Sequence, residues 1–558
     1  MRSAMACAGL SAFGLVACTV EVTDRTSSPL VYNPPINEQT FRVDVDSDQR
    51  VDAVDILVPG VASGPMRASG SGAFEAALPL APCAEIAEYS VDVTTNRGRT
   101  IRRFPEAGLF THAITGQPAS CTGFMGAVSQ TFVVDREADF PDSAPGDGFC
   151  AGGTALAGGC SLRAAVMEAN ARRGADLIRL PPGRYTLSRD GSEGDAGVDA
   201  SIRDLDITDT LTIEGTGSGT MSVVRFLVAD FSNPATALQD DPESDALIAK
   251  IDGGDVDRVL HVSGAGTIAR LRNLAIVNGS SDGAGGGVLN SATLVLERVA
   301  LSDNAVVRPE RSRIGGGAIH NDGLLVADDI VLAQNQVGGN VLNPSGGALF
   351  NEGTATIRNG LLAYNDARFG AAINNAAGAV LRLTNTTVYA HRYANSTPVS
   401  TVVNLGETTA EFVTIAGNRI GNGRMLSNAE SATLRLGNSL ILDNRADSGG
   451  RLCAGSITTT GGNVADADCA IASGPRGLDF FNVAVSGRGG IEDVGGFSPV
   501  YRPTIPGAGS SLFNPIDRAA ALTPFPFFDQ RGAPFSRRVD GDGDGSGTPD
   551  PGAYEHQG

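Results

Sequence analysis

The sequence predicts a mainly β protein in which a parallel β-helix, closed at one end by an α-helix, follows a small β-sandwich. Three observations predict this fold. A segment ending in Asn recurs six times at steps of 24 to 31 residues, and β-branched residues alternate with polar ones between the recurrences. Hydrophobic residues make up 42% of the 558 residues, so the chain can bury a sizeable core.

The recurring segment places small and apolar residues directly before its Asn, as in residues 286–290 and 346–351. Stacked coils would bring equivalent residues about 4.8 Å apart, so their side-chain amides would form a ladder. We predict that the ladder is structural and that His320 and His391 substitute in it for Asn or turn residues. The first markers are Asn290, Asn321, Asn351, Asn375, Asn404 and Asn428; the second are Asn278, Asn304, Asn335, Asn365, His391, Asn418 and Asn444.

Residues 39–118 alternate apolar and polar positions in short runs separated by Gly, Ser, Asn and Pro, as in residues 41–45 and 89–93. This pattern predicts a small immunoglobulin-like β-sandwich. Nothing in it indicates catalysis.

Residues 160–170, with Cys150 before them and residues 178–187 after them, resemble the CSLREA domain that opens many bacterial surface β-helices. Ala164 stands where that family has Glu, which removes any ion pair that the Glu would make. The resemblance implies that residues 128–200 form a cap and the first strands, followed by the β-helix over residues 201–500. An amphipathic helix near residues 161–173 would cover the open end of the solenoid. We expect residues 218–248 to form an exposed insertion.

The repeats also resemble those of polymorphic outer-membrane proteins, which form right-handed parallel β-helices of the kind that pectinases and polysaccharide lyases share. Residues 529–534 and 550–555 resemble the ending of the choice-of-anchor Q surface proteins, which assigns residues 501–558 to such a segment.

Residues 1–17 read as a lipoprotein signal peptide, and residues 15–18 resemble the bacterial lipobox. The resemblance implies a lipid on Cys18, residues 18–38 as a tether, and an exported lipoprotein at the outer membrane or cell surface of a Gram-negative bacterium, with outer-membrane lipid as a partner. The alternative is an ordinary signal peptide with Cys18 unmodified.

Six further cysteines predict three disulfides between nearest neighbours, although 15 connectivities are open and zinc binding is the alternative. They are Cys83, Cys121, Cys150, Cys160, Cys453 and Cys469. The net charge of −20, with Lys250 as the single Lys, argues against nucleic acid as a partner.

Asp540, Asp542 and Asp544 have the spacing of the first ligands of a calcium loop, which makes calcium the one cofactor that the sequence suggests. The loop's twelfth position holds Pro551 instead of Glu, so an acidic hairpin that binds no calcium is the alternative.

Aligning the coils puts Glu297 beside Asp328, and Arg298 beside Asp329, on adjacent rungs, with Arg358 following in the first column. Glu297 and Asp328 could be the two carboxylates of a glycosidase, but a salt-bridged row on the solvent face explains them better, because repeat faces are charged to stay soluble. The sequence therefore favours a non-enzymatic surface lipoprotein for adhesion or for contact with extracellular matrix, surface proteins or polysaccharide. The alternative is a carbohydrate-active enzyme, either a polysaccharide lyase or a glycoside hydrolase.

Overall fold

The structure is a computed structural model of the chain. It describes residues 2–9, 16–26, 30–31, 38–47, 50–58, 62–79, 86–95, 100–104, 110–115, 130–151, 159–189, 199–217, 240–307, 315–338, 344–391, 400–420, 423–446, 452–466, 469, 471–473, 479–480, 483, 490–503, 519, 526, 528–532, 534–537, 539 and 548–557. Among these residues, no helix has both the length and the apolar character needed to span a bilayer.

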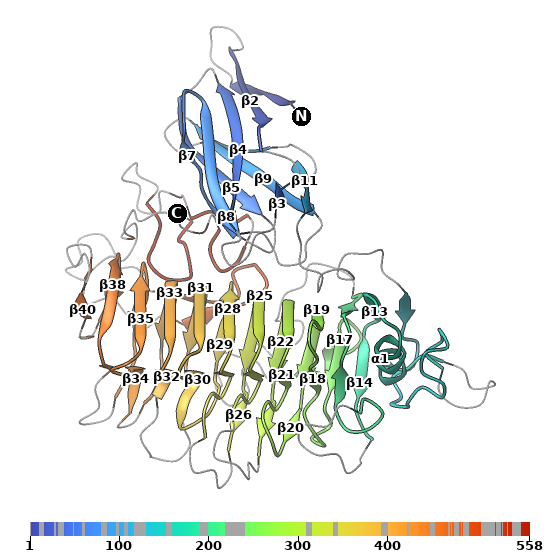
Figure 1. The fold of residues 1–558 in the computed structure, drawn as a ribbon. Helices are drawn as coiled ribbons and strands as arrows, with labels where there is room; N and C mark the ends of the chain where they lie inside the picture. Colours follow the sequence, from blue (N-terminus) through green and yellow to red (C-terminus); the bar gives the residue numbers. More distant parts are fainter. Residues whose placement is uncertain are drawn as a thin grey trace.

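The N-terminal part is a two-sheet β-sandwich, as the alternating pattern predicted (Figure 1). Inward-facing residues of both sheets meet in its core, where the rings of Phe41 and Tyr89 lie with centroids 5.1 Å apart. One sheet contains β1 (Arg2–Gly9), β2 (Val16–Asp24), β4 (Glu38–Ser47), β8 (Ala73–Pro79) and β7 (Arg67–Ala68). The other contains β3 (Leu30–Val31), β11 (Phe110–Thr115), β9 (Ile86–Thr95), β5 (Val51–Val58), β6 (Ala62–Pro65) and β10 (Thr100–Phe104).

The prediction of a tether over residues 18–38 is wrong at its start, because strand β2 covers residues 16–24. β2 pairs antiparallel with β4, and Val20 and Val22 are buried in the sandwich core. Asp24 also accepts a 2.6 Å hydrogen bond from the Tyr89 hydroxyl. The sandwich therefore begins well before residue 39, and Cys18 lies within β2. The alternation of Val20 and Val22 with polar residues is too short to distinguish a strand from a linker in the sequence.

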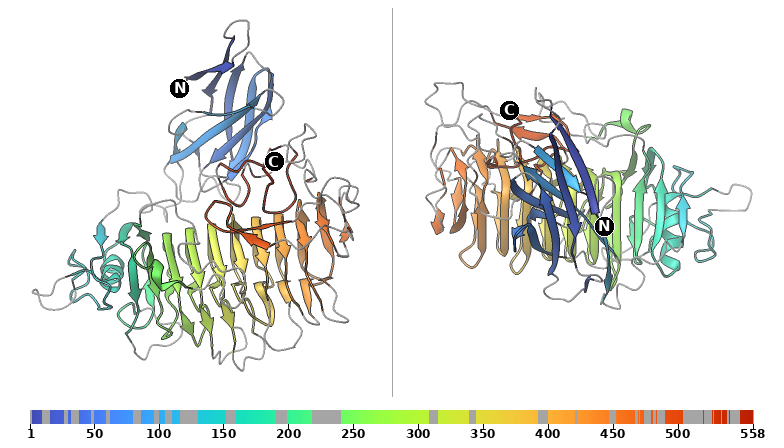
Figure 2. Two further views of the ribbon diagram at one scale, coloured as in Figure 1. Left: turned by 180° about the vertical axis from the view of Figure 1, so that it is seen from behind. Right: turned by 90° about the horizontal axis from the view of Figure 1, so that it is seen from above.

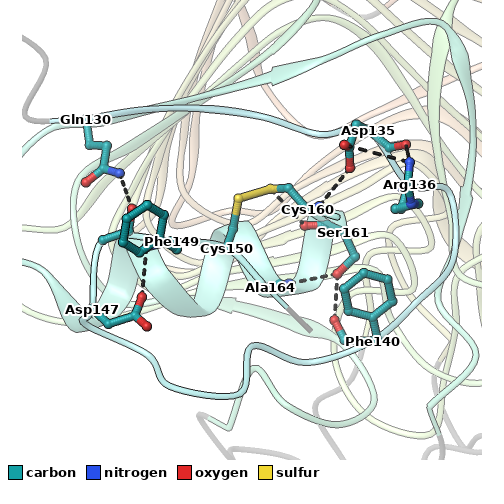
Figure 3. The surroundings of a disulfide bond; sticks show 11 residues. Gln130, Asp135, Arg136, Phe140, Asp147, Phe149, Cys150, Cys160, Ser161 and Ala164 are labelled. Carbon is teal, nitrogen blue, oxygen red and sulfur yellow. Dashed lines mark hydrogen bonds and ion pairs between the residues drawn. A yellow bond between two sulfur atoms is a disulfide. The ribbon is translucent and has the colours of Figure 1, made fainter. Parts of the chain in front are cut away.

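The solenoid is closed at its first coil by α1 (Leu162–Ala171), as expected (Figure 3). Ser161 caps the helix by accepting a hydrogen bond from the Ala164 amide, and its own hydroxyl donates to the Phe140 carbonyl. The fully buried Arg163 donates to Asp139 at 2.6 Å and to the backbone carbonyls of two further residues, Ala200 and Arg203. Arg163 therefore has a carboxylate partner although Ala164 replaces the family's Glu.

The coils stack as parallel strands in two main sheets and one short one, which is the arrangement of a β-helix (Figure 1). The longest sheet contains β12 (Thr131–Val133), β13 (Asp176–Leu180), β14 (Gly183–Thr186), β16 (Leu211–Gly215), β17 (Ala249–Asp252), β19 (Ile268–Val277), β22 (Thr293–Ser302), β25 (Leu324–Ala333), β28 (Thr354–Arg358), β29 (Leu361–Ala363), β31 (Val380–Tyr389), β33 (Glu407–Ala416), β35 (Thr433–Gly437), β36 (Leu440–Leu442), β38 (Ile457–Gly461), β39 (Val464–Ala465) and β40 (Ile471–Ser473). The second contains β15 (Leu205–Ile207), β18 (Leu260–Val262), β21 (Val288–Asn290), β24 (Ile319–Asn321), β27 (Leu349–Asn351), β30 (Phe369–Asn375), β32 (Ser400–Asn404), β34 (Arg424–Asn428) and β37 (Cys453–Ala454). The short one contains β20 (Ser280–Ser281), β23 (Ala305–Val306) and β26 (Gln336–Val337).

Two expected boundaries of the solenoid change. Parallel pairing continues past β40 to a bridge between Val464 and Phe480, whereas β41 (Gly490–Glu492) and β42 (Val500–Arg502) form an antiparallel hairpin, so the parallel coils of the described residues end before residue 490. The described end of the 218–248 insertion is not simply exposed, because Asp240 bonds Lys250 at 2.6 Å and Arg184 at 2.7 Å. The fully buried Lys250 needs such carboxylate partners. A single 3₁₀ turn, η3 (Pro242–Ser244), lies beside this cluster.

The C-terminal segment packs along one side of the solenoid, between the later coils and the sandwich (Figure 2). Its Gln530 accepts a hydrogen bond from the Thr387 hydroxyl of β31, and its Ala553 amide donates to the Thr414 hydroxyl of β33. The buried Arg531 binds the Asp529 carboxylate through two nitrogens. The residues that resemble the choice-of-anchor Q ending are therefore packing residues in this protein.

Candidate functional site

Glu297 and Asp328 are brought together as the coil alignment predicted. They are direct partners in the parallel pairing of β22 with β25, and Asp328 is in turn paired with Arg358 of β28. Arg272 of β19 precedes Glu297 in the same column, and its Nε lies 2.5 Å from the Glu297 carboxylate. The column therefore places two neighbouring acids between two arginines along four successive coils.

A bend in each long strand puts a second charged column next to the first. Arg298 and Asp329 both have the left-handed backbone conformation, with φ of 53° and 52°. Strands β22 and β25 pair in the same register on both sides of the bend, so Arg298 and Asp329 lie side by side on adjacent coils. The bend is found at the same place in every described coil from β19 to β35, at Asn273, Arg298, Asp329, Asn359, Asn385, Phe412 and Asn438.

Asp328 and Asp329 form a pair of neighbouring carboxyl groups at this bend. Burial, with Asp328 as the next contribution, raises the pKa of Asp329 to about 8. Burial also raises the pKa of Asp328, against the opposing effects of Arg358 and of a 2.8 Å hydrogen bond from Asn359. Both carboxyl groups therefore favour the protonated form more than an exposed carboxyl group does, and the titration of each depends on the other. The sequence placed Asp329 next to Arg298 but gave no sign of these raised pKa values.

The six predicted ladder residues lie in one column, and the side-chain amide nitrogen of each of the first five donates to the amide oxygen of the next, while Asn428 donates to the Ser456 carbonyl. The donor to acceptor distances along the column are 2.6, 2.7, 2.7, 2.9 and 2.7 Å, from Asn290 through Asn321, Asn351, Asn375 and Asn404 to Asn428. Asn351 is fully buried and also donates to the Val380 carbonyl. These hydrogen bonds use the amide nitrogens to join coil to coil.

A second ladder runs through the later markers. The Asn335 side chain donates to the Asn365 side chain at 2.9 Å. His391 continues the column, because its Nδ1 accepts from the backbone N–H of Asn365. Burial lowers the pKa of His391 to about 4, so the neutral ring substitutes for Asn, as expected. Asn278 is not part of this ladder, because Gly279 takes its place and donates to Asn304. Asn278 precedes that position in the left-handed conformation.

His320 differs from His391, and its expected role as a ladder substitute is wrong. The ladder position belongs to Asn321, whereas the buried ring of His320 lies one residue earlier and stacks on Phe350 with centroids 5.0 Å apart. Its Nε2 lies 3.0 Å from Asp322 and 3.4 Å from Glu352 on the next coil. Hydrogen bonds to both carboxylates outweigh burial and raise the pKa of His320 to about 9.

A second histidine and carboxylate cluster lies in the first coils and is fully buried. It consists of His261, Asp204 and Asp206, with His261 Nδ1 2.9 Å from Asp206. Arg258 already lies 2.7 Å from Asp204, so a guanidinium group neutralises this cluster. Burial raises the pKa of Asp204 to about 7. Sequence reasoning missed both histidine clusters, although their alignment on adjacent coils was a usable signal.

The structure contains two of the three expected disulfides, Cys150–Cys160 beside α1 (Figure 3) and Cys453–Cys469 at the far end of the solenoid. Cys83 and Cys121 lie outside the described residues, as do Asp540, Asp542 and Asp544 of the predicted calcium loop. These remain predictions. Asp550 is described, and its carboxylate accepts from the His556 amide.

No family model and no curated protein matches the chain. Among solved structures, the chain is similar to the crystal structure of pectate lyase Pel9A, with 14% sequence identity, 77% of this chain and 97% of that chain covered, and a TM-score of 0.35. The parallel pairing of successive coils places this chain among the β-helix proteins.

Proposed function

We propose that this protein is a non-enzymatic surface protein whose β-helix presents its outer face to acidic polysaccharide or matrix. The observation that carries this proposal is the column of Arg272, Glu297, Asp328 and Arg358, in which two arginines flank two acids and balance their charge. Exposed arginines beside the column, Arg298 and Arg382, supply charge for an anionic ligand. A repetitive, rigid face of this kind suits a repetitive ligand.

We also propose that the chain is exported and lipidated at Cys18, and that it is a relative of CSLREA and choice-of-anchor Q proteins. Two disulfides support an oxidising compartment. Cleavage before Cys18 would remove β1 (Arg2–Gly9) from the sandwich but keep β2 from Cys18 onward. Because Val20 is buried in β2, the lipid would hold the sandwich directly at the membrane surface. Mass spectrometry of the amino-terminal peptide from membrane fractions should find a diacylglyceryl Cys18. A soluble periplasmic protein with an unmodified terminus would contradict this anchor.

Binding is tested by retention of the purified full chain on immobilised acidic and neutral polysaccharides. The double variant Arg298→Gln with Arg382→Gln should lose retention on the acidic ones, and high salt should weaken the wild type. The matched control is Arg67→Gln, which removes an exposed arginine from the sandwich. Equal retention of all three proteins would reject the proposed face.

The second candidate is a carbohydrate-active enzyme, and the carboxyl pair at the bend favours it specifically. A glycosidase needs one protonated and one ionised carboxyl group, and Asp329, whose pKa is raised to about 8, would supply the proton donor beside a second carboxyl group. Incubation with the same polysaccharides should then release new reducing ends or unsaturated products. If the wild type depolymerises any of them, and neither Asp329→Asn nor Glu297→Gln with Asp328→Asn does, the non-enzymatic proposal is wrong.

A further inference from the structure

We propose that His320, Asp322 and Glu352 form a binding site for a divalent transition metal of the zinc class, which joins two neighbouring coils. The ligand atoms would be Nε2 of His320 and one carboxylate oxygen from each acid. All three lie within 4.8 Å of one another. This site is independent of the polysaccharide face.

The distances suit a small metal ion. Nε2 of His320 lies 3.0 Å from Asp322 Oδ1 and 3.4 Å from Glu352 Oε2. A tetrahedral ion with ligands at about 2.0–2.1 Å has ligand atoms about 3.3 Å apart, so these contacts match the edges of such a polyhedron. Calcium needs six to eight oxygens at longer distances and is disfavoured by an imidazole ligand.

The imidazole is oriented as a metal ligand requires. Its other nitrogen, Nδ1, lies 3.3 Å from the Gly315 carbonyl, which can accept a hydrogen bond from Nδ1–H. A metal ion would therefore displace only the Nε2 proton, and the Nε2 lone pair would face the ion between the carboxylates. Phe350 stacks on the ring and fixes its plane. Gly315 permits this arrangement, because a Cβ there would lie 2.8 Å from the Phe350 ring and 2.2 Å from the Ser345 carbonyl.

The acids remain accessible while the imidazole does not. The side chain of His320 is 4% exposed, whereas those of Asp322 and Glu352 are 43% and 29% exposed. An ion could therefore enter from solvent and keep water as a fourth ligand. Asp322 and Glu352 each follow a ladder residue, Asn321 and Asn351, and these ladder residues hold the two carboxylates on adjacent rungs.

The cluster at His261 provides the contrast. It also combines a histidine with two acids, but it is buried and Arg258 occupies it from within. Its affinity for a cation should be low because a positive group is already bound. This makes it an internal control with similar residue types.

The test is calorimetric titration of the chelator-treated full chain with Zn²⁺, with Co²⁺ absorption as a second readout of tetrahedral nitrogen and oxygen ligation. One equivalent should bind, and Glu352→Gln, a change at a partly exposed position, should weaken binding at least about 10-fold. His320→Gln should do the same, and a thermal scan should show that both variants fold. His261→Gln and Glu430→Gln should bind as the wild type does.

Three results would overturn the proposal. The first is a folded wild type that binds no Zn²⁺. The second is Zn²⁺ binding that is unchanged in both Glu352→Gln and His320→Gln, which would indicate an adventitious surface site. The third is binding that is lost in His261→Gln alone, which would move the metal to the first coils.

Discussion

The left-handed residues at the bends of the long strands form a column along the solenoid. The two halves of this column share a backbone conformation but differ in what covers them. In the earlier coils its side chains are Asn273, Arg298, Asp329 and Asn359, which all face solvent in part. In the later coils they are Asn385, Phe412 and Asn438, each no more than 4% exposed. The C-terminal segment lies over this second half: Phe528 accepts from Asn385, and the Arg537 guanidinium lies 4.3 Å from the Phe412 ring centroid.

The difference shows how burial changes the side chains that occupy one repeated position. Where the column faces solvent, two of its four side chains are charged, because exposed charges cost little and keep the face soluble. Where the C-terminal segment packs on the column, all three side chains are neutral, and the guanidinium of Arg537 beside them has several hydrogen-bond partners. It donates to Asn385 at 2.8 Å and to the Gly552 and Ala553 carbonyls at 2.8 and 3.0 Å.

The largest loss of stability is expected from Arg537→Met, because Arg537 belongs to the C-terminal segment that covers the later coils. Arg537 and Glu555 are both fully buried, 3.6 Å apart, and burial raises the pKa of Glu555 well above its usual range. Removing the guanidinium leaves Glu555 without this partner and costs about 3–5 kcal/mol. Chemical unfolding should show the loss, and limited proteolysis should release the C-terminal segment.

The matched control for Arg537→Met is Arg435→Met. Arg435 also pairs with a carboxylate, Glu407 at 3.1 Å, but the two side chains are 47% and 52% exposed. The control should cost less than about 1 kcal/mol. Equal losses of unfolding free energy in the two variants would mean that the buried arginine contributes no more to stability than the exposed one.

Replacing ladder residues should affect both halves alike, because the ladder runs through the coils of both. Asn351→Ala changes a coil of the solvent-facing half and Asn404→Ala a coil of the covered half, and the side-chain amide of each asparagine donates to the next coil at 2.7 Å. Each change leaves buried partners unsatisfied and should cost on the order of 1–3 kcal/mol. Thermal unfolding measures both. A negligible loss in either variant would contradict a structural ladder there.

In the solvent-facing half, Asp329→Asn should change how the stability of the protein depends on pH. The folded pKa of about 8 lies above the unfolded value, so the folded state binds more protons and stability falls as pH rises from about 4 to 8. The variant should equal the wild type near pH 4 and exceed it by on the order of 1–2 kcal/mol above pH 8. Denaturant titrations at these two pH values measure the difference. A constant difference would show that Asp329 titrates normally.

The smallest effect is expected from Glu297→Gln combined with Asp328→Asn. Glu297 pairs with Arg272 at a site where both side chains are about one-third exposed, and Asn at position 328 can still accept from Asn359. The free energy of unfolding should change by less than about 1 kcal/mol. A loss of several kcal/mol in denaturant titrations would mean that the charged column holds the coils together.

Much of the fold could be predicted because it is repetitive. The period of the Asn markers set the pairing of coils, so the register of Glu297 with Asp328 and of the ladder followed from alignment alone. The helix α1 and its Ser161 cap followed from local spacing. Strand β2 could not be recognised, because two buried valines become a strand only when β4 pairs with them.

The sequence by itself determined the stacking, since each coil repeats the same short-range pattern and buries it on a copy of itself. Only the tertiary structure decided which outer positions are buried, because that depends on segments distant in the chain. Asn385 lies under Phe528 and Arg537, 143 and 152 residues away. His320 and His391 looked alike in the sequence, yet one lies beside two carboxylates and titrates high, while the other is enclosed in a neutral ladder and titrates low. Burial and neighbouring charge set those properties, and neither is written in the local sequence.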